Sequence, residues 1–137
     1  MKIEEITDSI IQTKWFNQPI DKVWKAITEN NQVSKWLVPT NFKAEVDFKY
    51  FLQDPKSECN VFTGTVKKAS PYTLVYTWIN EVETLVSWEL IEEKGGTLLQ
   101  MTHSRISNYT TGVKPKMVES YTSGWVRCFD NISSLLK

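Results

Sequence analysis

Hydrophobic positions change their spacing twice along the chain, and each change marks a boundary between predicted elements. Segment 6–16 is rich in Ile, Thr, Trp and Phe, which is typical of a strand. A helix is predicted behind Pro19, where hydrophobic side chains recur at steps of three and four: Ile20, Val23, Trp24 and Ile27. A second short helix is predicted at 33–37, and Pro39 ends it because proline disfavours helical geometry in the residue before it.

From residue 42 onward the spacing becomes two, as in strands with one buried and one exposed face. The clearest alternation predicts a strand over 42–50, with hydrophobic side chains at Phe42, Ala44, Val46, Phe48 and Tyr50. Gly64 predicts a bulge or a close backbone approach, and Gly95-Gly96 predicts a hairpin turn. The further strands are predicted at 61–67, 72–78, 84–91 and 97–103.

A long helix is predicted over about 116–136. Its hydrophobic side chains recur at steps of three and four: Val118, Tyr121, Trp125, Cys128, Phe129, Ile132, Leu135 and Leu136. About 20 residues at ~1.5 Å per residue give a length of roughly 30 Å, and the wide apolar stripe needs an equally apolar surface to cover it. The order of elements predicts an α+β protein in which one curved antiparallel sheet packs around this helix.

Composition and charge narrow the classes of function. With 137 residues, 41% hydrophobic and 23% charged, the chain is expected to form a single folded domain, 1–137. Lys plus Arg equals Asp plus Glu, at 16 each, so a general nucleic-acid binder or a protein held on an anionic membrane is not expected. We find no signal peptide and no apolar run long enough for a transmembrane helix, so a cytoplasmic location is expected.

Motifs for cofactors, metals and catalysis are scarce in the sequence. The chain has a single His, and its two cysteines, Cys59 and Cys128, lie far apart. A closed structural metal site needs about four such ligands, so none is expected. We find no phosphate-binding glycine loop, nucleophile elbow or zinc-protease motif, so no cofactor and no catalytic residue are predicted.

His103 is the candidate polar residue of the interior, because it shares a strand face with apolar neighbours. We expect a buried, neutral, structural imidazole that hydrogen-bonds the hydroxyl of Tyr109 or Tyr121, or a backbone carbonyl within 105–121. A polar group in a ligand pocket and a general acid or base are the alternatives. A nucleophilic dyad with Cys128 is not expected, because that residue lies too far along the helix.

Several stretches together resemble a known family. In order they are QPIDKVWKAITE (18–29), VSKWLVP (33–39), GTVKKASPYTLVYTW (64–78), GGTLLQMTHS (95–104) and the GW pair (124–125). Their order and spacing resemble the START-like (SRPBCC, Bet v 1-like) helix-grip superfamily, and within it the family of the C-terminal domain of the activator of Hsp90 ATPase. The resemblance implies a cavity between the sheet and the last helix, which relatives use for hydrophobic ligands or, in some, for cyclase-type chemistry.

The leading hypothesis is therefore non-catalytic binding of a small hydrophobic or amphipathic molecule in that cavity. Ser120, Gly124 and Cys128 form a small-residue stripe that indicates either close helix–sheet packing or room for a ligand. A protein-interaction module of the co-chaperone type is the alternative, with a protein partner or a homodimer left open. A cyclase or hydrolase is a third. The residues expected to line the cavity are Phe48, Tyr76, Trp78, Trp88, Met101, His103, Tyr121 and Trp125.

Overall fold

The computed structural model of the protein describes residues 9–53, 60–79, 82–109, 112 and 114–137. Its elements follow the predicted order of one strand, two short helices, five strands and a long helix. They are β1 (Ile10–Phe16), α1 (Ile20–Thr28), α2 (Asn30–Trp36), β2 (Lys49–Gln53), β3 (Asn60–Ser70), β4 (Thr73–Ile79), β5 (Glu83–Glu93), β6 (Gly96–Ser104), the short 3-10 helix η1 (Ile106–Asn108) and α3 (Lys114–Leu135). Residues 6–8 of the first predicted strand lie outside the described ranges.

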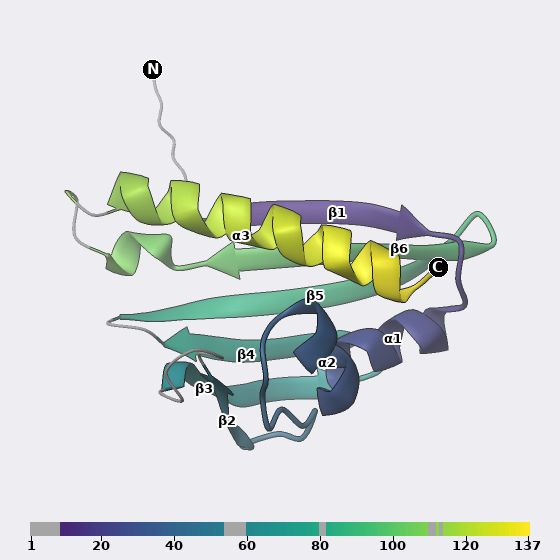
Figure 1. Ribbon diagram of the computed structural model, residues 1–137, viewed down its shortest axis with the longest axis horizontal. Coiled ribbons are helices and arrows are strands. Elements are labelled where there is room, and N and C mark those ends of the chain that lie inside the picture. The colour runs from purple at the N-terminus through teal and green to yellow at the C-terminus, as the bar shows by residue number, and fades with distance from the viewer. Residues whose placement is uncertain (1–8, 54–59, 80–81, 110–111, 113) are drawn as a thin grey trace.

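One antiparallel sheet holds all six described strands, in the order β1-β6-β5-β4-β3-β2. The sheet twists, and α3 runs across one of its faces, with α1 and α2 packed on the same face beside it (Figure 1). This arrangement confirms the predicted α+β class and the packing of the last helix on the sheet. Within the described ranges, no helix is long and apolar enough to cross a membrane.

The core lies between the inner face of the sheet and the three α-helices. Inward positions alternate along the strands as predicted, so that Leu99, Met101 and His103 of β6 are all fully buried. Helix α2 is tied to α1 by the Trp36 indole, whose Nε1–H donates to the Ala26 carbonyl at 2.8 Å. The buried Trp88 ring packs edge-on against Trp36. These aromatic contacts therefore join the two short helices to the centre of the sheet.

The strand predicted over 42–50 is wrong for residues 42–48. A turn forms there, in which the Phe48 N–H donates to the Glu45 carbonyl at 2.9 Å. Asp47 adopts a left-handed backbone with φ of 71°, which a short polar side chain tolerates better than a branched one. The two-residue hydrophobic spacing misleads here because Phe42 and Phe48 pack inward from an irregular segment while Val46 is exposed.

The free edge of β2 is covered by two side chains that precede it. The Phe51 N–H donates to Asn41 Oδ1 at 2.8 Å, and the Thr40 hydroxyl donates to the Phe51 carbonyl at 2.7 Å. Side chains thus supply the hydrogen bonds that a neighbouring strand would otherwise make. Strand β2 begins only at Lys49, because the turn before it has already reversed the chain.

Gly64 lies at a close approach between neighbouring strands, as predicted from a glycine within a strand pattern. A Cβ atom at this position would overlap the carbonyl oxygen of Thr77 in β4 and the ring of Tyr50 in β2. The register of β3 against β4 also shifts between Val66 and Lys68. Only glycine lets these three strands pack this closely.

We expect Gly64→Ala to lower the free energy of unfolding by about 1–3 kcal/mol, because the methyl group must displace a backbone carbonyl or the Tyr50 ring. Urea unfolding followed by far-ultraviolet circular dichroism measures the change. The matched control is Gly124→Ala in α3, where a Cβ meets no atom within 4 Å. Alanine favours helix, so this control should gain up to about 1 kcal/mol. Equal unfolding midpoints for the two variants would contradict the expectation.

Candidate functional site

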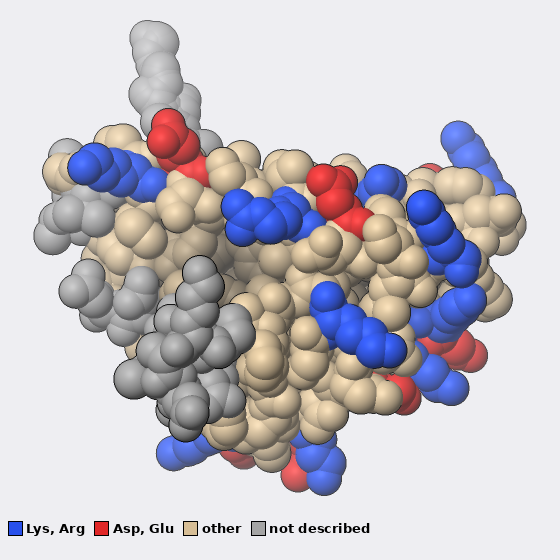
Figure 2. Space-filling model, in the orientation of Figure 1, with Lys and Arg blue, Asp and Glu red and all other residues tan. Residues whose placement is uncertain are grey.

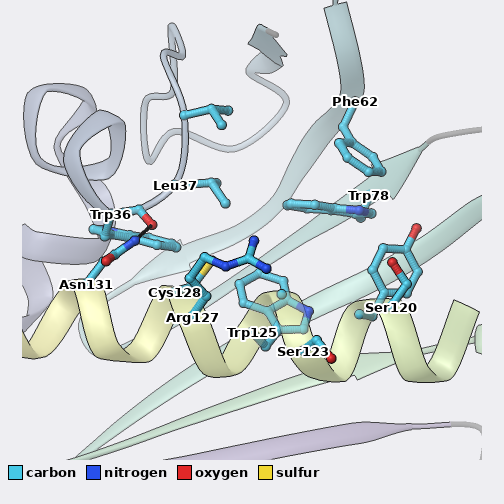
Figure 3. Close-up of a pocket in the computed structure, with 13 residues that line it drawn as sticks. Trp36, Leu37, Phe62, Trp78, Ser120, Ser123, Trp125, Arg127, Cys128 and Asn131 are labelled. Carbon is cyan, nitrogen blue, oxygen red and sulfur yellow. Dashed lines mark hydrogen bonds between the residues drawn. The ribbon is translucent and has the colours of Figure 1, made fainter. Parts of the chain in front are cut away.

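A cavity of about 400 Å³ opens between α3, the end of α2 and the β3–β4 part of the sheet. The surface is hollowed below α3, and its border carries some basic side chains but is mostly uncharged (Figure 2). Figure 3 shows the side chains that converge on it from these elements. The residues that line it are Trp36, Leu37, Val38, Phe62, Trp78, Ser120, Tyr121, Ser123, Gly124, Trp125, Arg127, Cys128 and Asn131.

Small residues of α3 leave the space that the cavity occupies. Ser120, Gly124 and Cys128 lie four residues apart and therefore on one face of the helix, and all three line the cavity. A Cβ atom at Gly124 would meet nothing within 4 Å. Of the two interpretations of this stripe, close helix–sheet packing and room under the helix, the geometry favours room under the helix.

The sheet side of the cavity is aromatic. The ring centroids of Trp78 and Trp125 lie 5.4 Å apart, and those of Phe62 and Trp78 lie 4.7 Å apart. Trp78 is buried, and its Nε1–H has no hydrogen-bond partner among the described residues. An unpaired buried donor lowers the free energy of unfolding by about 1–3 kcal/mol, so the Trp78 indole in this wall reduces the stability of the fold.

A chain of hydrogen bonds behind this wall joins α3 to the sheet. The Trp125 Nε1–H donates to His103 Nδ1 at 3.0 Å, and His103 Nε2 lies 2.7 Å from the hydroxyl oxygen of Thr84. The Thr84 hydroxyl donates in turn to the Trp78 carbonyl at 2.8 Å. An indole can only donate and a carbonyl can only accept, so His103 must carry its proton on Nε2.

The environment of His103 favours the neutral imidazole. Burial lowers its pKa to about 3, from an ordinary value of 6.5. Protonation would also place a proton on Nδ1, facing the N–H of Trp125, so two donors would oppose each other. Both ring nitrogens are thus engaged in structure, and His103 is placed behind the cavity wall.

The structure confirms a buried His103 that faces the helix side of the sheet, and corrects the partners expected for it. The expected hydroxyls, those of Tyr109 and Tyr121, pair with each other at 2.7 Å. Tyr121 packs its ring on the imidazole, with centroids 4.4 Å apart. The partners are instead the Thr84 hydroxyl on the neighbouring strand and the Trp125 indole on α3.

The ionisable side chains among the described residues of the cavity are Tyr121, Arg127 and Cys128. Burial raises the pKa of the Cys128 thiol to about 12, against a smaller lowering by the nearby Arg127 charge, so the sulfur is protonated at neutral pH. No group of three or more His, Cys, Asp or Glu in the described part of the chain could hold a metal ion. The cavity thus combines apolar walls with one cation, which suits binding better than proton transfer.

Three of the eight residues predicted to line the cavity do so: Trp78, Tyr121 and Trp125. The other five lie outside its lining. Phe48 packs against the core just before β2, and the other four are buried in the core behind the wall: Tyr76, Trp88, Met101 and His103.

Sequence reasoning missed the contributions of α2 and of the polar side of α3. Trp36 is not among the residues predicted to line the cavity, yet it does so. The small-residue stripe of Ser120, Gly124 and Cys128 was the one sequence pattern that indicated space under α3. No sequence pattern pointed to Arg127, because an exposed arginine on a helix is ordinary.

Comparison with known proteins gives a family and a fold. The model of the family described as Activator of Hsp90 ATPase homolog 1-like protein matches residues 17–137. The protein MLL2253 of Mesorhizobium loti has a similar structure, with a TM-score of 0.83 and 21% identity over 93% of this chain and 96% of that one. The protein BH1534 of Bacillus halodurans has a TM-score of 0.78 and 23% identity, over 94% of this chain and 96% of that one.

CalU16 of Micromonospora echinospora gives a TM-score of 0.78 at 23% identity, over 94% of this chain and 76% of that one. These similarities confirm the helix-grip fold predicted from the sequence. No match was found among curated protein sequences.

We expect His103→Leu to lower the free energy of unfolding by about 1–3 kcal/mol, because it leaves the Trp125 N–H without an acceptor and the Thr84 hydroxyl oxygen without a donor. In His103→Gln, the amide oxygen can accept from Trp125 and the amide nitrogen can donate to Thr84, so this variant should retain more of the stability. Urea midpoints at pH 7.5 compare the two. A His103→Leu protein at least as stable as wild type would argue against the structural role.

The pH dependence of stability tests the neutral imidazole. Between about pH 3 and 6.5 the unfolded chain binds a proton that the folded chain excludes, so stability is complete above pH 6.5 and falls as the pH is lowered. From pH 7 to 5 the loss should approach ~2 kcal/mol. Since the chain has a single His, His103→Gln should remove most of this slope. Parallel profiles for the two proteins would contradict the assignment.

Proposed function

The chain belongs to the family of Activator of Hsp90 ATPase homolog 1-like proteins, and on that premise we propose that it binds a small hydrophobic or amphipathic molecule, without chemistry, beneath α3. The cavity of about 400 Å³ carries the proposal. Small-molecule sites usually measure ~300–1,000 Å³ and combine apolar walls with a few polar groups. The aromatic wall and the few polar residues of α3 match that description.

The chemistry of the wall supports binding over catalysis. General acid–base catalysis needs a titratable group within hydrogen-bond reach of the substrate. His103 has both ring nitrogens engaged behind Trp125, and the Cys128 thiol is held protonated. A cyclase or hydrolase would therefore have to rely on Tyr121 and Arg127 among the described residues of the cavity, which makes it the weaker hypothesis.

One observation favours the alternative of a protein-interaction module. On the outer face of the sheet, Trp15 of β1 pairs with Leu98 of β6, and Leu98 pairs with Ile91 of β5. Trp15 and Ile91 are partly exposed, at 39% and 44%. This row is short, however, and the alternative requires a fully packed interior, which the cavity under α3 opposes.

A series of 1-alkanols tests the proposed binding. Affinity should rise by up to about fourfold per added methylene from 1-hexanol to 1-decanol, because each buried methylene contributes about 0.8 kcal/mol, and should level off when the cavity is full. Trp36, Trp78 and Trp125 line the cavity, so quenching or shift of tryptophan fluorescence measures occupancy.

Gly124→Leu provides the matched test, because its side chain extends into empty space and fills part of the cavity. It should weaken 1-decanol binding at least tenfold, while its urea midpoint should be no lower than that of wild type, because leucine favours helix more than glycine does. Val126→Leu, at an exposed position of the same helix, is the control and should bind as wild type does. If the alkanols gave no saturable signal, or if both variants bound equally well, the interaction module would become the better hypothesis.

A further inference from the structure

Arg127 stands apart from the other residues of the cavity. Among the described residues of the wall it is the only Lys, Arg, Asp or Glu. Its guanidinium projects from α3 into the space between Leu37 and Trp125, below Trp78 (Figure 3). Burial raises the pKa of the half-buried Cys128 thiol beside it, and the Arg127 charge opposes part of that rise, so its field reaches the lining of the cavity.

No carboxylate within the described part of the chain forms an ion pair with Arg127. The ion pair that the described residues do form joins Lys43 to Glu45, far from α3 in the sequence. A cation beside an apolar wall attracts an anion more strongly than it would in bulk water, because the effective dielectric constant is lower. The planar guanidinium also matches the two oxygens of a carboxylate.

The other polar side chains of the wall are uncharged, which leaves Arg127 as the place for a charged head group. The Asn131 side chain donates to the Trp36 carbonyl at 3.4 Å and so links α3 to α2. The unpaired Trp78 Nε1–H is enclosed in the wall with almost no accessible surface. A ligand therefore meets aromatic and aliphatic surface and a few neutral polar groups within the cavity, and a cation at its opening.

We infer that the cavity selects amphiphiles with a single anionic group, a carboxylate above all, which pairs with Arg127 while an apolar tail lies against Trp78, Phe62 and Leu37. This inference rests on the proposed function and adds the charge of the ligand to it. The ligand is a free molecule in solution, because the tail must enter the space under Gly124. A bidentate, charge-assisted pair at a partly exposed site is worth about tenfold in affinity.

Decanoate and 1-decanol have the same chain length and differ in the head group. Comparing them therefore separates the contribution of the head-group charge to the affinity from that of the apolar tail. At pH 8 and low ionic strength, below the concentration at which decanoate forms micelles, wild type should bind decanoate about tenfold more tightly than 1-decanol. Tryptophan fluorescence and titration calorimetry measure both. The preference should shrink in 0.5 M NaCl, because salt screens an exposed pair.

Arg127→Gln should weaken decanoate binding about tenfold and change 1-decanol binding less than twofold. Arg127→Lys should keep an intermediate preference, because it retains the charge but loses the planar geometry. Lys116→Gln removes an exposed cation from the same helix, outside the cavity lining, and should leave both affinities unchanged. Gly124→Leu should weaken binding of both ligands, since the tail can no longer enter.

The outcomes distinguish this inference from the proposed function. Equal affinities for the two ligands, with Arg127→Gln affecting them equally, would overturn the anionic head group and leave the binding function standing. Decanoate binding that survives Gly124→Leu would also overturn the inference, because it would reflect ion pairing on the outer surface. Failure of both ligands to bind would overturn the proposed function itself.

Discussion

The position of the Trp125 ring in the cavity wall is fixed by one chain of hydrogen bonds, which also joins α3 to the sheet. It starts at the Trp125 indole, passes through His103 and Thr84, and ends at the Trp78 carbonyl. The indole N–H at one end can only donate and the carbonyl at the other end can only accept. Every hydrogen bond in the chain must therefore be donated in the direction from Trp125 towards the Trp78 carbonyl. The Trp125 ring is thereby held against the sheet.

Most of the fold was predictable because periodicity reports which face of an element is buried. The helical spacing behind Pro19 and the long stripe of α3 led to the correct elements, and so did the alternation in β6. The prediction over 42–48 failed because alternation records burial and not backbone geometry. A left-handed Asp47 and inward-facing side chains in a turn give the same pattern as a strand.

The cavity was predictable only in part, for a different reason. Parity places Trp78 and Met101 on the same inner side of the sheet, but it does not give the depth at which each side chain ends. Trp78 reaches the cavity wall, whereas Met101 lies fully buried behind it. Arg127 was missed since its contribution depends on which neighbour its flexible side chain approaches, and that is decided by tertiary packing.

The side-chain bonds along β2 have a consequence for how copies of this protein behave at high concentration. An edge strand with unpaired N–H and C=O groups invites a strand from another molecule, which is a common route to aggregation. Asn41 and Thr40 already occupy the donor and the acceptor of Phe51 at this edge. The same two side chains that shape the entry to β2 therefore also block intermolecular strand addition at that end of the sheet.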